Sequence, residues 1–559
     1  MTAPHPTARS AQPLRAGERV VEAAPARARL RALAIVLTIG FALIGARAGQ
    51  LALTAPPEPK RVPAAVQTVS RGDIVDRNGV LLAVSVPAFV LTAAPRNVVD
   101  PDAAAAKLAT VLPDLDVAQT ARRLRQTNRA LVQLRRGLTP RQRQAIFDLA
   151  IPGIGFGPDQ RRFYPQGALA AHALGQVDAD LNGAAGVERA LDGEIRRAGA
   201  ADRALRLSLD VRIQHALETE LARAGAETNA KGGSGLVVDG RTGEVLALAS
   251  YPAMDANAAP RAGADVRLNR AAGAVYEMGS TLKPFTVAQA IDLGLVAPQA
   301  RVDVGPLTIG DVTLVDPHPL TSPAPLTEAL AKSSNVAAAR LALQVGADRQ
   351  RAMLETLGLF GRSGVELAES ARPLPPTGRA AIDVAVLGYG HGMAMSAAAL
   401  AGAYTVFAND GARAPLTLIA RAEPPTLTPV FSPQATAAVA AMMRAVVADG
   451  TGARAAADGY DVIGKTGTAE KPGPPGRGYD PDRMYSSFAA IFPGREPRYV
   501  IVLALDEPAR TQSAGGQATG GAVAAPAVGR LVARIAPMLG IAPTSRAASP
   551  SSSAGETKP

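Results

Sequence analysis

Cysteine is absent from this chain of 559 residues, and aromatic residues make up only 4% of it. Without cysteine the chain can form no disulfide, no zinc–thiolate site and no thiol nucleophile. The absence of cysteine suits an oxidising compartment but does not require one. The length leaves room for two or three domains with a sizeable core.

Lysine is also scarce: it accounts for 8 of the 59 basic residues, and arginine for the other 51. A formal net charge of +11 could indicate a nucleic-acid partner or an anionic membrane surface. The arginines are scattered without interleaved aromatic residues, however, which favours a solvated protein surface and no nucleic-acid partner. Where arginine is used almost everywhere, a retained lysine is a candidate for chemistry that a permanent cation cannot perform.

One uncharged apolar segment, residues 32–46, follows a basic N-terminal tail over residues 1–31. It is shorter than the roughly 20 residues that span a bilayer, but Arg31 and Arg47 could extend it by snorkelling. Arginines before the segment predict a cytoplasmic N-terminus. The small residues around Arg47 leave a cleaved signal peptide open. We favour an uncleaved transmembrane anchor over residues 32–53, and both alternatives export the rest of the chain.

Composition divides the remainder into a Pro-rich linker, a first domain over residues 54–204, a second over 205–540 and a Ser/Pro-rich, disordered tail over 541–559. In the first domain Asn78-Gly79 predicts a tight turn between strands, and residues 102–150 have helical periodicity. In the second domain, the expected strands lie near both ends of the segment 205–540, and the expected helices lie between and beside them in the sequence. The sequence therefore predicts an α/β or α+β fold with an antiparallel sheet, its elements lying at 211–225, 235–250, 327–345, 460–469, 485–492, 498–506 and 519–537.

The chemistry centres on residues 276–285, in which Ser280 and Lys283 would lie one turn apart on the same face of a helix. A serine hydroxyl needs a neighbouring base, and a lysine can be that base if burial lowers its pKa. Alone, Ser-x-x-Lys is a weak signal, since many solvated helix faces match it. Its flanks strengthen it, because Gly279 permits a sharp turn into the helix and Pro284 is tolerated in a first turn.

Two further motifs follow Ser-x-x-Lys along the chain. Ser333-Ser334-Asn335 lies just inside the helix expected over 327–345, and Lys465-Thr466-Gly467-Thr468 lies on an expected strand. The second motif offers a cation, a hydroxyl and an open backbone to a substrate carboxylate. Residues 459–466 also satisfy the Gly-x-x-x-x-Gly-Lys-Thr phosphate-loop pattern. We reject a nucleotide site there, because no buried strand precedes the lysine and nearby prolines forbid the required helix after it.

The ordered set Ser-x-x-Lys, Ser-x-Asn, Lys-Thr-Gly is typical of serine β-lactamases and penicillin-binding proteins. Over about residues 30–540 the chain resembles the class B penicillin-binding proteins, specifically the FtsI-type peptidoglycan D,D-transpeptidases of cell division. The short anchor and the arginine-rich segment 120–145 depart from the family pattern. Outside the three motifs the resemblance rests on the stretches 71–79, 164–167, 186–193, 269–270, 388–392, 465–470 and 505–508.

This resemblance implies a transpeptidase fold similar to serine β-lactamases, with a central antiparallel sheet flanked by helices, preceded by a mixed α+β dimerisation or pedestal domain. It assigns Ser280 as the nucleophile, Lys283 as the neutral base and Ser333 as a proton relay. Asn335 would hold the substrate amide and Lys283, while Lys465, Thr466, Gly467 and Thr468 would bind the terminal carboxylate. The backbone N–H groups of Ser280 and Thr468 would form the oxyanion hole.

The same resemblance implies a single-pass protein of the bacterial inner membrane with its catalytic domain in the periplasm. Its partners would be stem peptides ending in D-Ala-D-Ala, β-lactams, a lipid-linked-substrate glycosyltransferase of the FtsW type and other division proteins, with no metal or cofactor. The alternatives are the elongation-specific paralogue and an inactive scaffold. A soluble β-lactamase would not need the first exported domain, and residues before 205 are too few for an additional glycosyltransferase domain.

Overall fold

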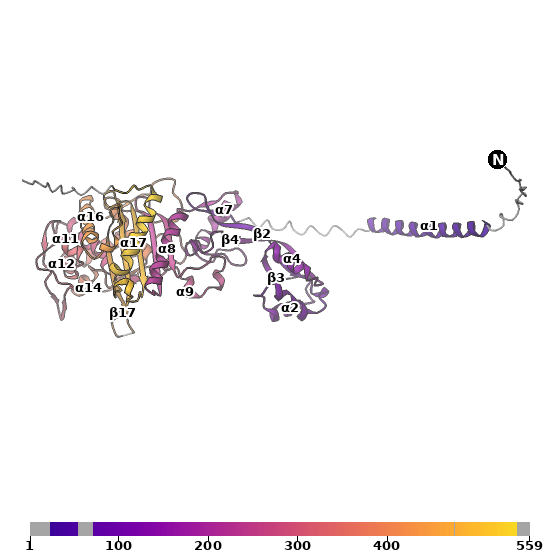
Figure 1. The fold of residues 1–559 in the computed structure, drawn as a ribbon, viewed down its shortest axis with the longest axis horizontal. Coiled ribbons are helices and arrows are strands. Elements are labelled where there is room, and N and C mark those ends of the chain that lie inside the picture. The colour runs from indigo at the N-terminus through magenta and orange to yellow at the C-terminus, as the bar shows by residue number, and fades with distance from the viewer. Residues whose placement is uncertain (1–22, 54–70, 475, 545–559) are drawn as a thin grey trace, which may run out of the picture. The chain divides into compact units, whose positions relative to one another are not determined.

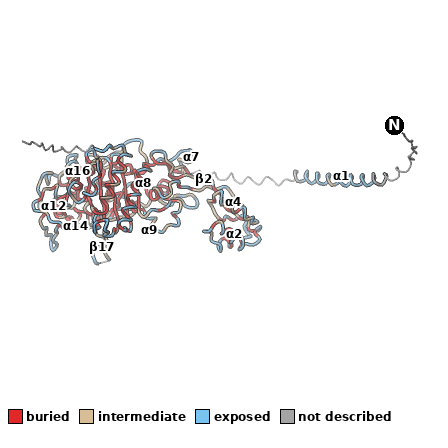
Figure 2. The backbone as a smooth tube through the Cα atoms, viewed as in Figure 1, coloured by how far each residue is buried: buried red, intermediate tan, exposed pale blue. Residues whose placement is uncertain are grey.

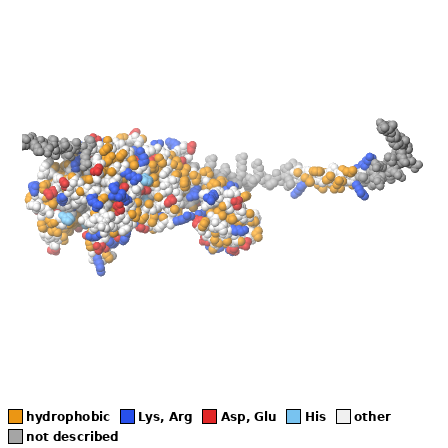
Figure 3. Space-filling model, in the orientation of Figure 1, with side chains coloured by type: hydrophobic (Ala, Val, Ile, Leu, Met, Phe, Trp, Pro, Cys, Tyr) orange, Lys and Arg blue, Asp and Glu red, His pale blue; other side chains and the backbone are white. Residues whose placement is uncertain are grey.

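The structure is a computed structural model that describes residues 23–53, 71–474 and 476–544. Helix α1 (Ala23–Leu53) belongs to a separate unit of the chain, and it is long and apolar enough over Arg27–Gln50 to cross a membrane. Figure 3 shows hydrophobic side chains along α1 and basic side chains towards its two ends. The helix is thus longer than the uncharged run 32–46, because it includes flanking arginines. Residues 1–22 of the basic tail expected over 1–31, the linker, and residues 545–559 of the tail expected over 541–559 lie outside the described residues.

The first folded region contains a sheet built around the long strand β2 (Leu81–Ala93) (Figure 1). β2 pairs antiparallel with β1, β3 and β4, and β1 pairs parallel with β5. The turn between β1 and β2 is the one expected at Asn78-Gly79: the Asp76 carboxylate accepts from the backbone N–H groups of Asn78 and Val80, and Gly79 has φ +88°. The other strands are β1 (Ile74–Val75), β3 (Val132–Leu138), β4 (Ile154–Phe163) and β5 (Leu205–Arg206).

Residues 102–150 are helical only in part. Side chains of α2, α3 and α4 share an apolar core with β2 and β3, and β3 lies between α3 and α4 in the chain. The sequence did not indicate β3, because Arg135 and Arg136 interrupt its apolar pattern. The helices of this region are α2 (Pro101–Val111), α3 (Val117–Leu124), α4 (Pro140–Asp148), α5 (Ala171–Leu174), α6 (Gly186–Ala190) and α7 (Asp192–Ala200).

The second sheet has the order β16–β17–β18–β6–β7, and every neighbouring pair is antiparallel. Its strands come from both ends of the segment, as the sequence predicted, and β18 from the C-terminal end pairs directly with β6 from the N-terminal end. Figure 2 shows that this part of the chain holds the most deeply buried backbone. The strands are β6 (Gly232–Asp239), β7 (Glu244–Tyr251), β16 (Ile463–Pro472), β17 (Tyr479–Phe492) and β18 (Tyr499–Asp506).

Helices cover both faces of this sheet, because alternate strand residues contribute to two separate apolar clusters. On one face α8 (Val211–Glu227) and α17 (Gly520–Ile535) pack against side chains such as Phe488 and Leu503. On the other, residues such as Val502 and Ala489 join a cluster with α10 (Lys283–Asp292), α15 (Ala397–Tyr404) and α16 (Pro433–Ala448). This layered arrangement is the predicted α+β fold.

The helix expected over 327–345 is two helices, α11 (Leu326–Ala331) and α12 (Asn335–Val345). Ser333 separates them in a left-handed conformation with φ +64°, and the Ser334 hydroxyl caps α12 by accepting from the N–H of Ala337. The other helices here are α9 (Ala264–Arg267), α13 (Ala347–Thr356) and α14 (Ala381–Leu387). Short paired strands complete the region: β8 (Tyr276–Glu277) with β13 (Ala394–Met395), β9 (Arg301–Val302) with β12 (Ala324–Pro325), β10 (Leu307–Ile309) with β11 (Val312–Leu314) and β14 (Ala412–Arg413) with β15 (Thr428–Pro429).

Candidate active site

Ser280 lies in a single 3₁₀ turn, Gly279–Leu282, that leads directly into α10. Gly279 has φ +55°, and a Cβ added there would lie 2.7 Å from the carbonyl oxygen of Thr468 on β16. Only glycine therefore allows the turn to approach the strand this closely. The buried hydroxyl of Tyr404 donates to the carbonyl of Thr281 over 2.6 Å and fixes the turn from the helical side.

Both motif lysines lie in the interior, where Lys283 is 1% exposed and Lys465 is 0% exposed. The Nζ atoms of Lys283 and Lys465 lie 3.0 Å and 2.9 Å from the same oxygen, Oγ of Ser333. Lys283 Nζ also contacts Asn335 Oδ1 at 2.7 Å and the Ser333 carbonyl at 2.5 Å. The three motifs, distant in sequence, thus meet around one hydroxyl.

Burial lowers the pKa of both lysines, because the charged form loses its hydration. The pKa of Lys465 falls to about 7. The pKa of Lys283 falls well below its ordinary value, first through burial and then through repulsion by the Lys465 charge, while Asp316 opposes the shift. The pocket therefore favours at least one neutral amine at neutral pH, which is what a lysine base requires.

Asp316 holds Ser334 and Asn335 in place, a role that the motifs did not indicate. Its carboxylate accepts from Ser334 Oγ and from the backbone N–H of Asn335, both at 2.5 Å, and from the N–H of Val336 at 3.2 Å. A carboxylate at this position satisfies the N–H groups that begin α12 and favours the helix dipole. Because 19 residues separate Asp316 from Asn335, no local capping pattern could reveal it.

The Lys-Thr-Gly motif lies within strand β16, not at the start of a helix, so the phosphate-loop interpretation is wrong as we argued. Thr466 Oγ1 lies 2.7 Å from Thr451 Oγ1, and Thr468 Oγ1 accepts from the N–H of Gly520. At Gly467 an added Cβ would lie 2.5 Å from the Met278 carbonyl, just before the turn that carries Ser280. Gly467 thus brings the edge of β16 against that turn.

A cavity of about 790 Å³ opens onto these residues. Its walls include Ser280, Ser333, Asn335, Thr466 and Thr468, whereas Lys283, Lys465 and Gly467 lie behind the wall. Within residues 71–474 and 476–544, no group hydrogen bonds to the Ser280 hydroxyl, which faces the cavity beside the Lys283 network. The predicted site residues therefore lie together around one space that a ligand of moderate size can enter.

His391 also lines this cavity and contacts Glu277 and Tyr479. The sequence analysis included His391 only within the stretch 388–392 and Glu277 only within 276–285, and it did not single out Tyr479. Glu277 Oε1 accepts from the Tyr479 hydroxyl at 2.8 Å and from the Gly392 N–H at 3.0 Å. His391 Nδ1 lies 3.6 Å from Glu277 Oε2. Burial lowers the pKa of His391 although Glu277 acts to raise it, so the imidazole at this wall is mainly neutral at pH 7.

Two family models match the chain: "Penicillin binding protein transpeptidase domain" over residues 233–533 and "Penicillin-binding Protein dimerisation domain" over residues 66–197. The chain is 44% identical to the probable peptidoglycan D,D-transpeptidase FtsI of Caulobacter vibrioides, over 84% of this chain and 82% of that protein. It is 31% identical to the peptidoglycan D,D-transpeptidase FtsI of Escherichia coli, with 85% of each covered.

Among solved structures, penicillin-binding protein 3 of the tuberculosis mycobacterium complexed with aztreonam matches with a TM-score of 0.67 and 28% identity. The match covers 85% of this chain and 97% of that one. The same protein complexed with ampicillin also gives a TM-score of 0.67. With both domain models matched, and with similarity along most of the length of the relatives, the chain belongs to the class B penicillin-binding proteins of the FtsI type.

Proposed function

We propose that this protein is a serine peptidoglycan D,D-transpeptidase that cross-links stem peptides during cell division and is acylated by β-lactams. The observation that carries the proposal is the Ser333 hydroxyl, which lies within 3.0 Å of Nζ of both Lys283 and Lys465 beside Ser280. If Ser280 and Lys283 merely shared a solvated helix face, there would be no reason for two fully buried amines to surround one hydroxyl. The family membership and the relatives named D,D-transpeptidase support the same reaction.

The contacts of Lys283 explain how it can serve as a base. A neutral amine has two N–H bonds and one lone pair, and two of its contacts, the Ser333 carbonyl and Asn335 Oδ1, are acceptors. Once both N–H bonds are used, the lone pair is left for a hydroxyl proton. It can take the proton of Ser280 as that oxygen attacks the carbonyl of the penultimate D-Ala.

The leaving group must then receive a proton, and Ser333 is the residue that can relay it. Its hydroxyl contacts both Lys283 and Lys465, so a proton taken up by Lys283 can pass through Ser333 Oγ to the nitrogen of the departing D-Ala. The carbonyl–nitrogen bond breaks, an ester forms on Ser280, and free D-Ala leaves. Asn335, held by Asp316, would position both Lys283 and the substrate amide.

Lys465, Thr466 and Thr468 would bind the terminal carboxylate of the donor peptide, since a cation and two hydroxyls on a strand edge suit a carboxylate. The backbone N–H groups of Ser280 and Thr468 would stabilise the oxyanion, a contribution worth about 3–4 kcal/mol for one donor. The close approach of the Gly279 turn to Thr468 supports this pairing of backbones. In the second half-reaction an amine of a neighbouring stem attacks the ester, and Ser280 regains its proton.

The membrane topology, the septal role and the glycosyltransferase partner are inferred from the family and from α1. We infer that α1 anchors the protein in the inner membrane with the catalytic domain in the periplasm, because Arg27, Arg29 and Arg31 lie at the N-terminal end of the apolar helix. We infer a septal role and a glycosyltransferase partner of the FtsW type from the division relatives. Depletion that produces filamentous cells supports the septal role, whereas rounded cells would assign the protein to elongation.

The reaction is tested with the full-length protein in detergent and an uncross-linked peptidoglycan polymer with pentapeptide stems. We expect cross-linked dimers and released D-Ala by mass spectrometry, and covalent labelling by a fluorescent penicillin. Ser280→Ala removes both, and Ser363→Ala, at a serine that does not line the Ser280 cavity, retains both. Wild-type protein that is neither labelled nor active would favour the inactive scaffold.

Membrane orientation can be tested cleanly because the chain has no cysteine of its own. Single cysteines are introduced at Ser10, before α1, and at Thr308, an exposed residue of β10. In spheroplasts a membrane-impermeant maleimide should label Thr308→Cys and leave Ser10→Cys unlabelled until the cells are lysed. Labelling of Ser10→Cys in intact spheroplasts would contradict the proposed orientation.

A further inference from the structure

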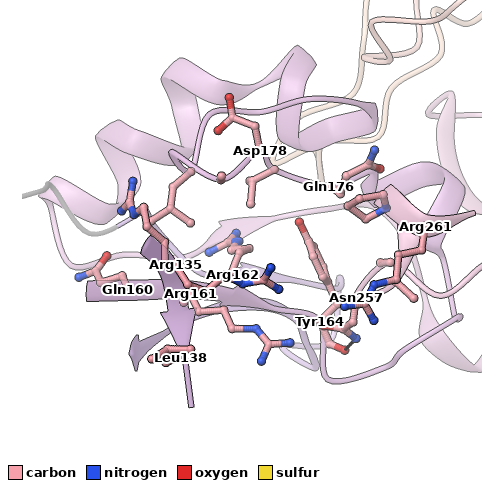
Figure 4. Close-up of a pocket in the computed structure, with 18 of the residues that line it drawn as sticks. Arg135, Leu138, Gln160, Arg161, Arg162, Tyr164, Gln176, Asp178, Asn257 and Arg261 are labelled. Atoms are coloured by element: carbon pink, nitrogen blue, oxygen red, sulfur yellow. Dashed lines mark hydrogen bonds between the residues drawn. The ribbon is translucent and has the colours of Figure 1, made fainter. Parts of the chain in front are cut away.

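A second cavity, of about 770 Å³, lies among β3, β4 and the loop that follows α5, and it shares no lining residue with the Ser280 cavity. Figure 4 shows it between the strands that carry Leu138 and Arg161 and the loop that carries Gln176 and Asp178. Its volume lies in the range of about 300–1,000 Å³ that is usual for small-molecule sites. The proposed transpeptidation uses none of its residues.

The walls of this cavity carry three buried polar atoms without a hydrogen-bond partner among the described residues. They are Nη2 of Arg162, Oε1 of Gln160 and Oε1 of Gln176. Arg162 is the most constrained, because its side chain is 1% exposed and its Nε is bound to Glu188 at 2.7 Å. These three lining residues therefore carry polar groups that the protein does not fully pair.

The cavity also has more basic than acidic groups. Arg135 and Arg261 contact the same oxygen, Oδ2 of Asp114, at 2.6 Å and 2.7 Å, so two guanidinium groups share one carboxylate. Arg161 on β4 has no ion pair or side-chain hydrogen bond within the described part of the chain, and it lines the cavity. A ligand that brings a carboxylate would therefore find cations that are not fully neutralised.

The mixture of groups narrows the chemistry of the ligand. The guanidinium groups of this lining offer N–H donors, and the amide side chains of Gln160 and Gln176 offer both donors and acceptors. Asp114 and Asp178 on the same walls would repel a polyphosphate. A peptide that carries a free carboxylate supplies both acceptors and N–H donors, and a cavity of this volume accepts a short segment of one.

We propose that this cavity binds an uncross-linked peptidoglycan stem peptide through its carboxylates and amide groups, at a site separate from the active site. The identity of the ligand rests on the proposed function, since a transpeptidase works among such peptides. A second site for a stem peptide would retain a glycan strand beside the enzyme while Ser280 handles another stem. An acidic segment of a partner protein is the competing occupant, and the test separates the two.

The test uses the full-length protein in detergent with the active site blocked by aztreonam, so that only other sites remain for a peptide. The probes are a disaccharide tetrapeptide, the same disaccharide without peptide, and a linear peptide of alternating Asp and Gly, each titrated by isothermal calorimetry. We expect the disaccharide tetrapeptide to bind and the bare disaccharide not to bind.

Arg161→Gln and Gln176→Ala should each weaken this binding about tenfold, as expected for the loss of a hydrogen bond to a charged or buried group. Arg122→Gln, at an exposed arginine of α3 that does not line the cavity, is the matched control and should bind as wild type. Labelling of each variant by fluorescent penicillin, before the block, checks that the active site remains folded.

Four outcomes would overturn the proposal: no binding to the blocked wild type, equal binding of the bare disaccharide, equal affinity in Arg161→Gln and Gln176→Ala, or binding of the Asp-Gly peptide alone. The last would assign the cavity to an acidic protein partner. If the proposed function is wrong, aztreonam will not acylate Ser280 in the wild type. Titration of Ser280→Ala with the same probes would still measure binding at this cavity.

Discussion

Lys465→Arg provides a test of how the depressed lysine pKa values control acylation. With a pKa of about 7, Lys465 is mostly charged at pH 6 and mostly neutral at pH 8. The β-lactam carboxylate needs the charged form, whereas Lys283 must be neutral to accept the Ser280 proton. The second-order rate constant for acylation should therefore rise with pH as Lys283 loses its proton and fall again as Lys465 does.

The size of the alkaline decline follows from the Lys465 pKa of about 7. The protonated fraction of Lys465 falls about tenfold between pH 6 and pH 8, and another tenfold for each further pH unit, equivalent to about 1.4 kcal/mol per unit. Arginine stays charged throughout this range. Lys465→Arg should therefore lose the alkaline decline, while its rate at pH 6 is reduced because the larger group displaces Ser333.

The assay is the rate of labelling by fluorescent penicillin between pH 5.5 and 9 at constant ionic strength. Lys231→Arg, at a lysine that is 70% exposed and paired with Glu507, should reproduce the wild-type profile. A wild-type rate that stays flat from pH 6 to 9, or an alkaline decline that persists in Lys465→Arg, would refute the assignment of that decline to Lys465.

Three further substitutions test other parts of the structure. Lys283→Arg should abolish penicillin labelling, because guanidinium cannot give up its proton. Lys107→Arg, at an exposed lysine of α2 outside the Ser280 cavity, is the control, and acylation of Lys283→Arg near the wild-type rate would exclude the base role. Gly279→Ala should slow labelling by about 100- to 1,000-fold through its clash with Thr468, as much as the loss of one oxyanion contact. Gly294→Ala, at φ +68° with no atom within 4 Å, should label normally, and equal rates in the two variants would refute the clash. Glu188→Ala leaves Arg71 and Arg162 buried without their shared carboxylate and should cost about 3–5 kcal/mol of unfolding free energy. Glu194→Ala, which removes a more exposed ion pair, should cost under about 1 kcal/mol. Fluorimetric melting that shows equal Tm values for the two variants would contradict this difference.

The main sheet could be predicted from the sequence because β18 and residues 485–492 of β17 are largely apolar, and β6 and β7 flank an obvious turn. The site could be predicted because its three motifs have fixed local spacings, even though their meeting at Ser333 is a property of the fold. The break between α11 and α12 could not, since it depends on Asp316, 17 residues before Ser333. Other contacts of the site also join residues that are far apart in the chain, so no local sequence pattern indicates them. They are the contacts made by Asp316, by Tyr404 and by His391 with Glu277.

The pairing of β6 with β18 has a consequence for how the protein matures. Asp239 lies opposite Tyr499, and Gly232 opposite Asp506, so the middle of the sheet cannot close until almost the whole chain has been synthesised. Ser280 emerges long before Lys465 and the strand that carries it. A nascent chain that ends before Lys465 therefore contains Ser280, Lys283 and Ser333 but lacks the Lys465 amine and its carboxylate site, so we expect fluorescent penicillin not to label it. We therefore expect penicillin labelling to appear only after β18 has been inserted between β17 and β6.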